Sequence, residues 1–370
     1  MNKINRQNCI ICLITVFLTN KFVLDVKSGM LMEASKVYFY DNISNLKEGV
    51  NNFFKMIADE MQTKEKVGIK IHFGERDNDT HISSKLLRDL PKYFEELAFI
   101  ECNVLYRGNR LRKEDHIKQA EDHGFDYIEI DILDGEMGED YSEIEIGTKN
   151  TKKAKIGRGL KNYSNLISIA HFKGHIVTGF GGALKNVGMG LGSRGGKLDM
   201  HAGVSPIIKE EMCKACGSCA EQCPADAIVV EDFAVIDKDS CIGCAQCIAV
   251  CPEGVIKIPW GKRPADEFLE KIAEYTLACI KDRKWWYINF LTDITMKCDC
   301  VGSKQKPFMD DIGILFSKDP IAIDKASIDL VIDRYGEDPF KKHNKDSIHI
   351  LKYGEKIGLG RIKYELIEVK

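Results

Sequence analysis

Eight cysteines in two matching runs carry the clearest chemistry in this sequence. Each run has the spacing C-x2-C-x2-C-x3-C-P, and each cysteine of the first run recurs 28 positions later, from 213 to 241 through 223 to 251. Three thiolates within seven residues suit one corner of an iron-sulfur cube, whereas structural zinc usually takes two well separated C-x2-C pairs. The runs are Cys213, Cys216, Cys219 and Cys223-Pro224, and Cys241, Cys244, Cys247 and Cys251-Pro252.

This spacing is typical of a bacterial-type ferredoxin module with two [4Fe-4S] clusters, in which each run supplies the fourth ligand of the other cluster. Eleven of the fourteen cysteines follow residue 200, which favours metal chemistry in a reducing compartment, the cytoplasm, over a disulfide framework. We therefore predict one cluster on Cys213, Cys216, Cys219 and Cys251, and the other on Cys241, Cys244, Cys247 and Cys223.

The composition narrows the class of protein further. A chain of 370 residues that is 44 % hydrophobic can form two or three domains, or one large α/β domain with an insertion. The net charge of -3, without a long basic run among aromatics, argues against nucleic-acid binding.

The first residues resemble the front of a secretory signal, because Lys3 and Arg6 precede an apolar stretch at 9–18. That stretch is too short for a stable membrane span, and no A-x-A cleavage site follows it. Met30 and Met32 stand just before an apparent first strand. We interpret 1–31 as a leader or, preferably, a misassigned start; an export or anchor signal and an ordered extension are the alternatives.

Short β-rich runs alternate with helical periodicity along most of the chain, which predicts an α/β body with a largely parallel sheet and helices. The simplest organisation is a body in two parts, 32–206 and 259–370, with the α+β ferredoxin module inserted at 207–258; two independent flanking domains are the alternative. The expected strands are 36–40, 66–72, 101–106, 126–132, 165–171, 285–291 and 311–316, and the expected helices are 46–61, 84–98, 112–122, 264–281 and 320–334.

The segment 171–201 concentrates histidines, lysines and nine glycines. Glycine lets backbone amides approach a ligand, and lysines supply charge for an anion, so we expect His171, Lys173, His175 and Lys185 at a site for an anionic small molecule. A glycine-rich connection with solvated lysines is the alternative. The match to G-x-G-x-x-G at 190–195 is weak, because it lies far beyond the preceding strand.

Cys298 and Cys300 could bind a third metal together with a histidine such as His201, since thiolate and imidazole suit zinc, iron or nickel. Such a pair is also often structural. His72 and Glu75 follow another expected strand, where α/β proteins bind ligands, and are candidates for proton transfer or ligation. A satisfied surface pair is the competing interpretation.

Five stretches of the chain are distinctive: KIHFGE at 70–75, NVLYRGNR at 103–110, the segment 167–197, KCDC at 297–300 and DIGILFSKDPIAID at 311–324. Together they resemble the domain of unknown function 362 family, in the form with an internal ferredoxin. The resemblance implies an α/β body and [4Fe-4S] binding, and supplies no reaction.

We therefore expect an iron-sulfur redox protein, an oxidoreductase of unknown substrate, that passes electrons between an external carrier protein and a site in the α/β body. A redox-sensing or partner-binding protein is one alternative. A non-redox metal enzyme that uses Cys298, Cys300 and histidine is another.

Overall fold

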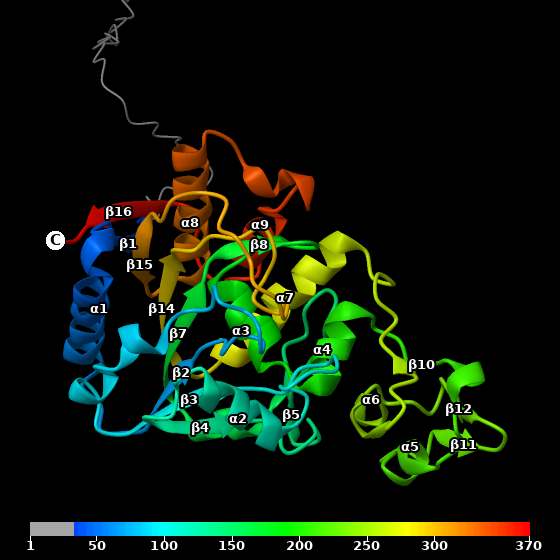
Figure 1. The fold of residues 1–370 in the computed structure, drawn as a ribbon. Helices are drawn as coiled ribbons and strands as arrows, with labels where there is room; N and C mark the ends of the chain where they lie inside the picture. Colours follow the sequence, from blue (N-terminus) through cyan, green and yellow to red (C-terminus); the bar gives the residue numbers. More distant parts are fainter. Residues whose placement is uncertain (1–32) are drawn as a thin grey trace, which may run out of the picture. The chain divides into compact units, whose positions relative to one another are not determined.

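Eight strands form one sheet within residues 33–370, the part of the chain that the computed structural model describes (Figure 1). Seven run in the same direction, and only β15 is antiparallel to its neighbours. The predicted largely parallel α/β body is confirmed. In order across the sheet the strands are β16 (Tyr364–Glu368), β1 (Ser35–Tyr40), β15 (Gly313–Ser317), β14 (Lys284–Leu291), β7 (Asn165–His171), β2 (Val67–Lys70), β3 (Leu97–Glu101) and β4 (Glu129–Ile132).

This sheet takes strands from both sides of 207–258, because β14, β15 and β16 follow that segment and the other five precede it. Ala34–Lys370 forms one compact unit. The chain therefore leaves the body at the cysteine-rich segment and returns to complete the same sheet. The predicted leader at 1–31 lies outside the described residues.

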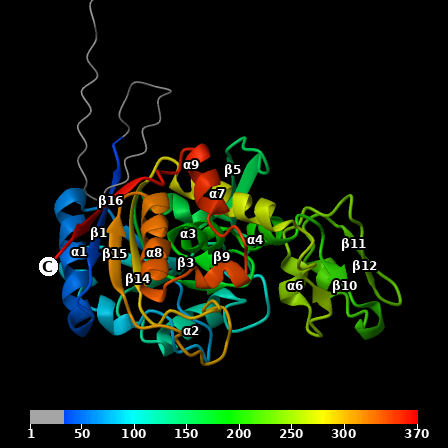
Figure 2. The ribbon, with the colours of Figure 1, turned by 90° about the horizontal axis from the view of Figure 1, so that it is seen from above.

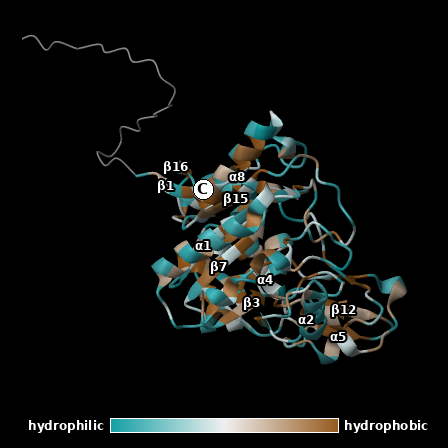
Figure 3. Ribbon diagram, turned by 60° about the vertical axis from the view of Figure 1, so that its left-hand side comes forward, coloured by the Kyte–Doolittle hydropathy of each residue, from teal (hydrophilic) through white to brown (hydrophobic). Residues whose placement is uncertain are grey.

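Helices cover both faces of the sheet (Figure 2). α1 (Leu46–Met61) buries Val50, Phe53, Phe54 and Ile57 on one face, because these residues form a stripe with helical spacing. α3 (Ala183–Leu191), α7 (Ala265–Ile280), α8 (Pro320–Tyr335) and α9 (His349–Lys356) bury apolar residues on the other face. Hydrophobic colour is concentrated along the sheet between them (Figure 3).

The remaining helices and strands lie mainly in connections. They are α2 (Lys113–Asp122), α4 (Arg194–His201), β5 (Tyr141–Glu145), β6 (Lys153–Gly157), β8 (Lys173–His175) and β9 (Gly179–Gly181), with the 3-10 turns η1 (Ile43–Asn45), η2 (Ser84–Leu87), η3 (Leu90–Lys92), η4 (Arg158–Asn162), η5 (Glu210–Met212) and η6 (Pro339–Lys342). Within 207–258 they are β10 (Ile207–Ile208), α5 (Ser218–Glu221), β11 (Ile228–Val230), β12 (Ala234–Ile236), α6 (Gln246–Val250) and β13 (Ile256–Lys257).

The predicted helix at 84–98 is wrong. Pro91 lacks a backbone N–H and confines this segment to the short turns η2 and η3, after which the chain enters β3. All five residues of β3 are buried, so its apolar run belongs to a strand and not to a helix face. The strand predicted at 101–106 accordingly lies four residues earlier, at Leu97–Glu101.

The glycine-rich segment after β7 is mostly helical and not an open loop. Its glycines allow close packing, since a Cβ on Gly188 would stand 2.3 Å from the carbonyl oxygen of Ile272 in α7. A Cβ on Gly196 would stand 2.2 Å from the carbonyl oxygen of Lys155 in β6. At these positions glycine brings α3 and α4 against neighbouring backbone, which fixes the lysines and histidines that these helices carry.

Candidate functional site

Two small cavities in the segment 207–258 are each lined by four cysteines, and each has a volume of about 20 Å³. In both cavities three cysteines come from one run and the fourth from the other run. The first cavity has Cys213, Cys216, Cys219 and Cys251, and the second has Cys223, Cys241, Cys244 and Cys247. These are the two sets that the cysteine spacing assigns to the two predicted clusters.

The backbone repeats together with the cysteines. Ala215 and Gly243 both have positive φ, as do Gly217 and Ala245, and the members of each pair are 28 positions apart. Left-handed residues between cysteines bend each loop around its cavity, a conformation that costs alanine more than glycine. Two backbone amides donate toward cysteine sulfurs, from Ala227 to Cys223 Sγ (3.3 Å) and from Ala234 to Cys213 Sγ (3.5 Å).

The thiols of these cavities do not share one electrostatic environment. Burial and the neighbouring cysteines raise the pKa of Cys247, whereas hydrogen bonds with Ser218 lower the pKa of Cys216. No three histidine, cysteine or acidic side chains in the described part of the chain are placed to hold a single metal ion. Each cysteine of a [4Fe-4S] cube binds a different iron, so its four thiolates stand further apart than the ligands of one ion. The four cysteines around each small cavity are the donor type and number that such a cube would take.

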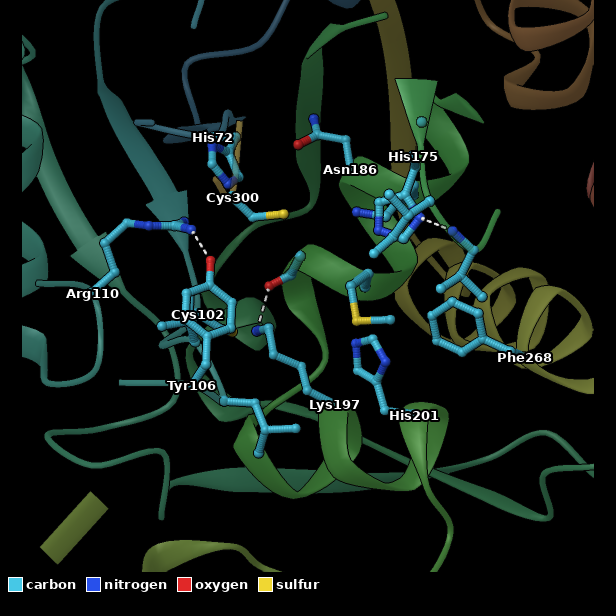
Figure 4. Close-up of a pocket in the computed structure, with 18 of the residues that line it drawn as sticks. His72, Cys102, Tyr106, Arg110, His175, Asn186, Lys197, His201, Phe268 and Cys300 are labelled. Atoms are coloured by element: carbon cyan, nitrogen blue, oxygen red, sulfur yellow. Dashed lines mark hydrogen bonds between the residues drawn. The ribbon is translucent and has the colours of Figure 1, made fainter. Parts of the chain in front are cut away.

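A much larger cavity, of about 510 Å³, lies beyond the carboxyl ends of β2, β3 and β7 (Figure 4). This is the edge where α/β sheets bind ligands, and the volume is within the usual range for a small-molecule site. Six of the nine predicted body residues line it: His72, Lys173, His175, Lys185, His201 and Cys300. Four further lining residues were not among the predicted site residues, although the motifs that contain them were noted: Lys70, Tyr106, Arg110 and Lys197.

Cationic side chains on the cavity wall are mostly paired with carboxylates. The pairs are Lys70 with Glu101 (Nζ to Oε2, 3.1 Å), Arg110 with Glu75 (Nη2 to Oε1, 2.6 Å), Lys173 with Asp299 (Nζ to Oδ2, 3.1 Å), and Arg263 with Asp199 and Glu267. Glu75 is thus a buried partner of Arg110 and Tyr106 and does not line the cavity. Glu75 therefore orients two wall residues, Arg110 and Tyr106, whereas the sequence predicts proton transfer or ligation for it.

Two lysines have no carboxylate partner. Lys185 has no hydrogen-bond or ion-pair partner among the described residues, and Lys197 donates only to the carbonyl oxygens of Gly190 (3.0 Å) and Gly192 (2.6 Å). Burial lowers the pKa of Lys185 to about 7, and the charge of Lys173 contributes to that shift. The wall therefore holds an excess of positive charge, and Lys185 can gain or lose a proton near neutral pH.

Three histidines face the cavity as neutral rings. His72 Nδ1 accepts from the amide of Gly74 (3.0 Å), and His175 Nδ1 accepts from that of Thr178 (3.1 Å), so each neutral ring carries its proton on Nε2. Burial holds both pKa values well below their usual range. His201 packs against Trp260 and Phe268, and burial together with Lys185 lowers its pKa to about 3.

His171 ends β7 but does not line the cavity. Its Nδ1 lies 3.0 Å from both carboxylate oxygens of Asp299, and its Nε2 lies 2.9 Å from the carbonyl oxygen of Thr292. Burial opposes ionisation of Asp299, but His171 and Lys173 together hold its pKa well below the usual range. His171 therefore anchors the loop that follows β14.

The predicted metal group of His201, Cys298 and Cys300 is not assembled. Cys298 and Cys300 are joined to each other in a disulfide, and only Cys300 of the two lines the cavity. His201 is held between two aromatic rings on α4. The residue between the cysteines, Asp299, has the structural role, because it pairs with His171 and Lys173.

The cavity and the cysteine-rich segment share a wall. Leu105 lines the cavity and also packs in the apolar cluster that contains Cys219, Cys247 and Cys251. Leu198 of α4 belongs to the same cluster, while Lys197 and His201 of that helix line the cavity. Arg107 adds a hydrogen bond to the carbonyl oxygen of Cys251 (3.2 Å).

Comparison of this chain with known proteins finds distant similarity to solved structures and a match to one protein family. The chain is similar to a protein from Thermotoga maritima (13 % identity, TM-score 0.38) and to the lactate racemase apoprotein from Thermoanaerobacterium thermosaccharolyticum (13 % identity, TM-score 0.37). The matches cover 79 % and 70 % of this chain, which spans 59 % and 51 % of those two proteins. No curated protein matches it.

Within the described residues, no helix is long and apolar enough to cross a membrane. The family profile described as Domain of unknown function (DUF362) matches residues 67–329, which include the cavity wall and both cysteine runs. The chain therefore belongs to this family.

Proposed function

We propose that this protein is an iron-sulfur redox protein, in which two [4Fe-4S] clusters exchange electrons with a small molecule bound in the large cavity. The observation that supports it best is the arrangement of eight cysteines in two sets of four, each around its own small cavity and each with one ligand from the other run. When bound, each cluster supplies or accepts one electron at a time.

The shared wall supports a local destination for these electrons. Leu105 and α4 contact the apolar surroundings of the cysteines on one side and the cavity on the other. Side chains of Leu105 and α4 thus pack against both the cavity and the cysteine-rich segment. An external carrier protein is the expected source or acceptor of the electrons.

The cavity residues then bind the ligand and move protons. Lys185 and Lys197 attract an anionic group, because neither has a carboxylate partner among the described residues. The Nε2 protons of His72 and His175 are available to hydrogen-bond a ligand, and Lys185 exchanges a proton near pH 7. Asp299 and Glu75 orient Lys173 and Arg110 without contacting the ligand.

The test is anaerobic reconstitution of the full chain with iron and sulfide, followed by metal analysis and electron paramagnetic resonance after reduction. We expect about eight iron and eight sulfide per chain and the signals of two reduced cubes. A product with zinc and no acid-labile sulfide would overturn the proposal. A Cys298→Ser, Cys300→Ser variant should bind the same iron, since neither residue lines the two small cavities.

A further inference from the structure

The large cavity has a charged floor and an apolar rim. Lys70, Glu101 and Arg110 line it and are at most 2 % exposed, so they form its deep end. Ile176 and Trp260 also line it and are 62 % and 52 % exposed, which places them at its opening. A ligand that satisfies both ends must have a charged group and an apolar body.

The sign of the charged group follows from the lysines. Lys185 has no partner among the described residues, and Lys197 has only backbone carbonyls, while the other cations of the floor are already paired. A buried cation without a counterion is costly, so an anion is the complementary ligand.

The hydrogen bonds at the starts of α3 and α4 bear on whether the anion is a phosphate or a carboxylate. Phosphate is usually bound by free backbone amides at a helix N-terminus. The N-terminus of α3 is already occupied by Asp324, which accepts from the amides of Ala183 (2.7 Å) and Leu184 (3.0 Å). At the start of α4, Ser193 accepts from Gly196 (3.2 Å) and Asp134 from Arg194 (3.3 Å). These amides at the two helix starts already have partners, so an anion in the cavity meets mainly side-chain cations, which are sufficient for a carboxylate.

We propose that the cavity binds a carboxylic acid with an apolar acyl or aryl body, its carboxylate held by Lys185 and Lys197 and its body lying toward Ile176 and Trp260. This inference rests on the proposed function, since it names the class of small molecule that meets the clusters. A volume of about 510 Å³ accommodates a carboxylic acid of modest size.

Anaerobic isothermal titration calorimetry on the cluster-loaded full chain tests it, with butanoate, hexanoate, hexanamide and hexyl phosphate as probes. We expect hexanoate to bind more than tenfold tighter than hexanamide and tighter than hexyl phosphate. Each added methylene should tighten binding about fourfold, because burial of a methylene is worth about 0.8 kcal/mol. Equal binding of acid and amide, or no dependence on chain length, would refute the proposal, and tighter phosphate binding would assign the site to phosphate esters.

Matched variants locate the two ends of the ligand. Lys185→Met should weaken hexanoate binding at least tenfold and leave hexanamide unchanged, while the exposed Lys342→Met should change neither. Ile176→Ala should reduce the gain from butanoate to hexanoate, whereas Val229→Ala, with a similar exposed fraction of 60 % in another segment, should not.

Iron analysis of the same samples separates this inference from the proposed function. Two clusters with no binding of hexanoate would refute the ligand class and leave the redox assignment standing. Tight hexanoate binding by a chain that holds no cluster after reconstitution would refute the redox assignment and leave the ligand class standing.

Discussion

The cysteine-rich segment and the large cavity are built in opposite ways. All eight cluster-type cysteines lie between Cys213 and Cys251, and short loops repeat their backbone conformation every 28 residues. The cavity wall instead draws on residues from Lys70 to Cys300, which the sheet brings to one edge. Local spacing therefore specifies the first site, and the tertiary fold specifies the second.

This difference predicts that a substitution in one site leaves the other site intact. Changes within the short loops should remove iron and leave the body folded, whereas changes at the buried pairs of the cavity should destabilise the body and leave the ligand sets intact. Only the shared wall, formed by Leu105 and α4, should transmit an effect from one to the other.

The largest effect is expected from loss of a cluster ligand. Cys251→Ala should reduce iron from about eight to about four per chain, because one cube loses a ligand. Adding Cys213→Ala should remove little more, since both residues line the same small cavity, whereas adding Cys241→Ala should remove nearly all iron. Metal analysis after anaerobic reconstitution measures this.

Cys279→Ala is the control, because Cys279 is buried in the body away from both small cavities. If adding Cys241→Ala to Cys251→Ala removes little further iron and adding Cys213→Ala removes nearly all of it, each run binds its own cluster.

The next effect is on stability of the body. Asp299→Asn leaves Lys173 without its carboxylate partner and weakens the contact to His171 in a buried setting. Removing one member of a buried ion pair typically costs about 3–5 kcal/mol, so the free energy of unfolding in urea should fall by that amount. Iron content should remain at its original value.

Asp310→Asn, at an exposed position, is the matched control and should change the free energy of unfolding by less than about 0.5 kcal/mol. Loss of iron from the Asp299 variant before the body unfolds would contradict the separation of the two regions.

The same contrast explains which features the sequence could predict. The grouping of the cysteines around two small cavities follows from their spacing, and α1, β7 and β14 follow from apolar periodicity, because these signals are local. That these sets bind clusters stays a prediction. Pro91 and a fully buried β3 misled the helix prediction at 84–98, since a short apolar run does not distinguish a strand from a helix. The β5–β6 pair, α9 and β16 gave no clear pattern and were not predicted.

The cavity was predicted only in outline. Strand ends correctly indicated where His72, Lys173 and His175 lie. The direction of each side chain depends on distant partners, so sequence could not show that His171 turns to Asp299 or that Glu75 pairs with Arg110. Tyr106 and Arg110 follow β3 in the NVLYRGNR stretch, and their place after a strand was the available signal.

The affinity for hexanoate is expected to change about tenfold per pH unit above pH 7. Lys185 has a pKa of about 7, lowered first by burial and then by Lys173, so its cationic form is lost as pH rises through 7. A bound carboxylate favours that form, and hexanoate affinity should therefore be constant below pH 7 and fall about tenfold per pH unit above it. Titration calorimetry from pH 6 to 8.5 measures both affinity and proton uptake.

The other groups around Lys185 should not produce this slope. His175 and His201 have lowered pKa values and stay neutral over this range, and the opposing carboxylate of Asp299 stays ionised. The cations near Lys185 are Lys173, Arg110 and Lys70. Burial also lowers the pKa of Lys70, and the charge of Glu101 opposes that shift, so the Lys185 variant must separate the two lysines. Lys185→Met should remove the pH dependence; a slope that persists in this variant would assign it to another group.

The smallest effect is expected at the shared wall. A Cβ on Gly195, at the start of α4, would stand 3.0 Å from the carbonyl oxygen of Gly243 and 3.2 Å from the Cα of Cys244, so the second cysteine run must shift by a few tenths of an ångström. Gly195→Ala should keep about eight iron and alter the resonance signal of the second cluster only. Gly108→Ala, whose Cβ would meet nothing nearer than Glu75 Oε2 at 3.5 Å, should leave the signal unchanged. If the Gly195 variant also changes hexanoate affinity, α4 couples the two sites; if the affinity is unchanged, the clusters and the cavity share a wall but remain energetically independent.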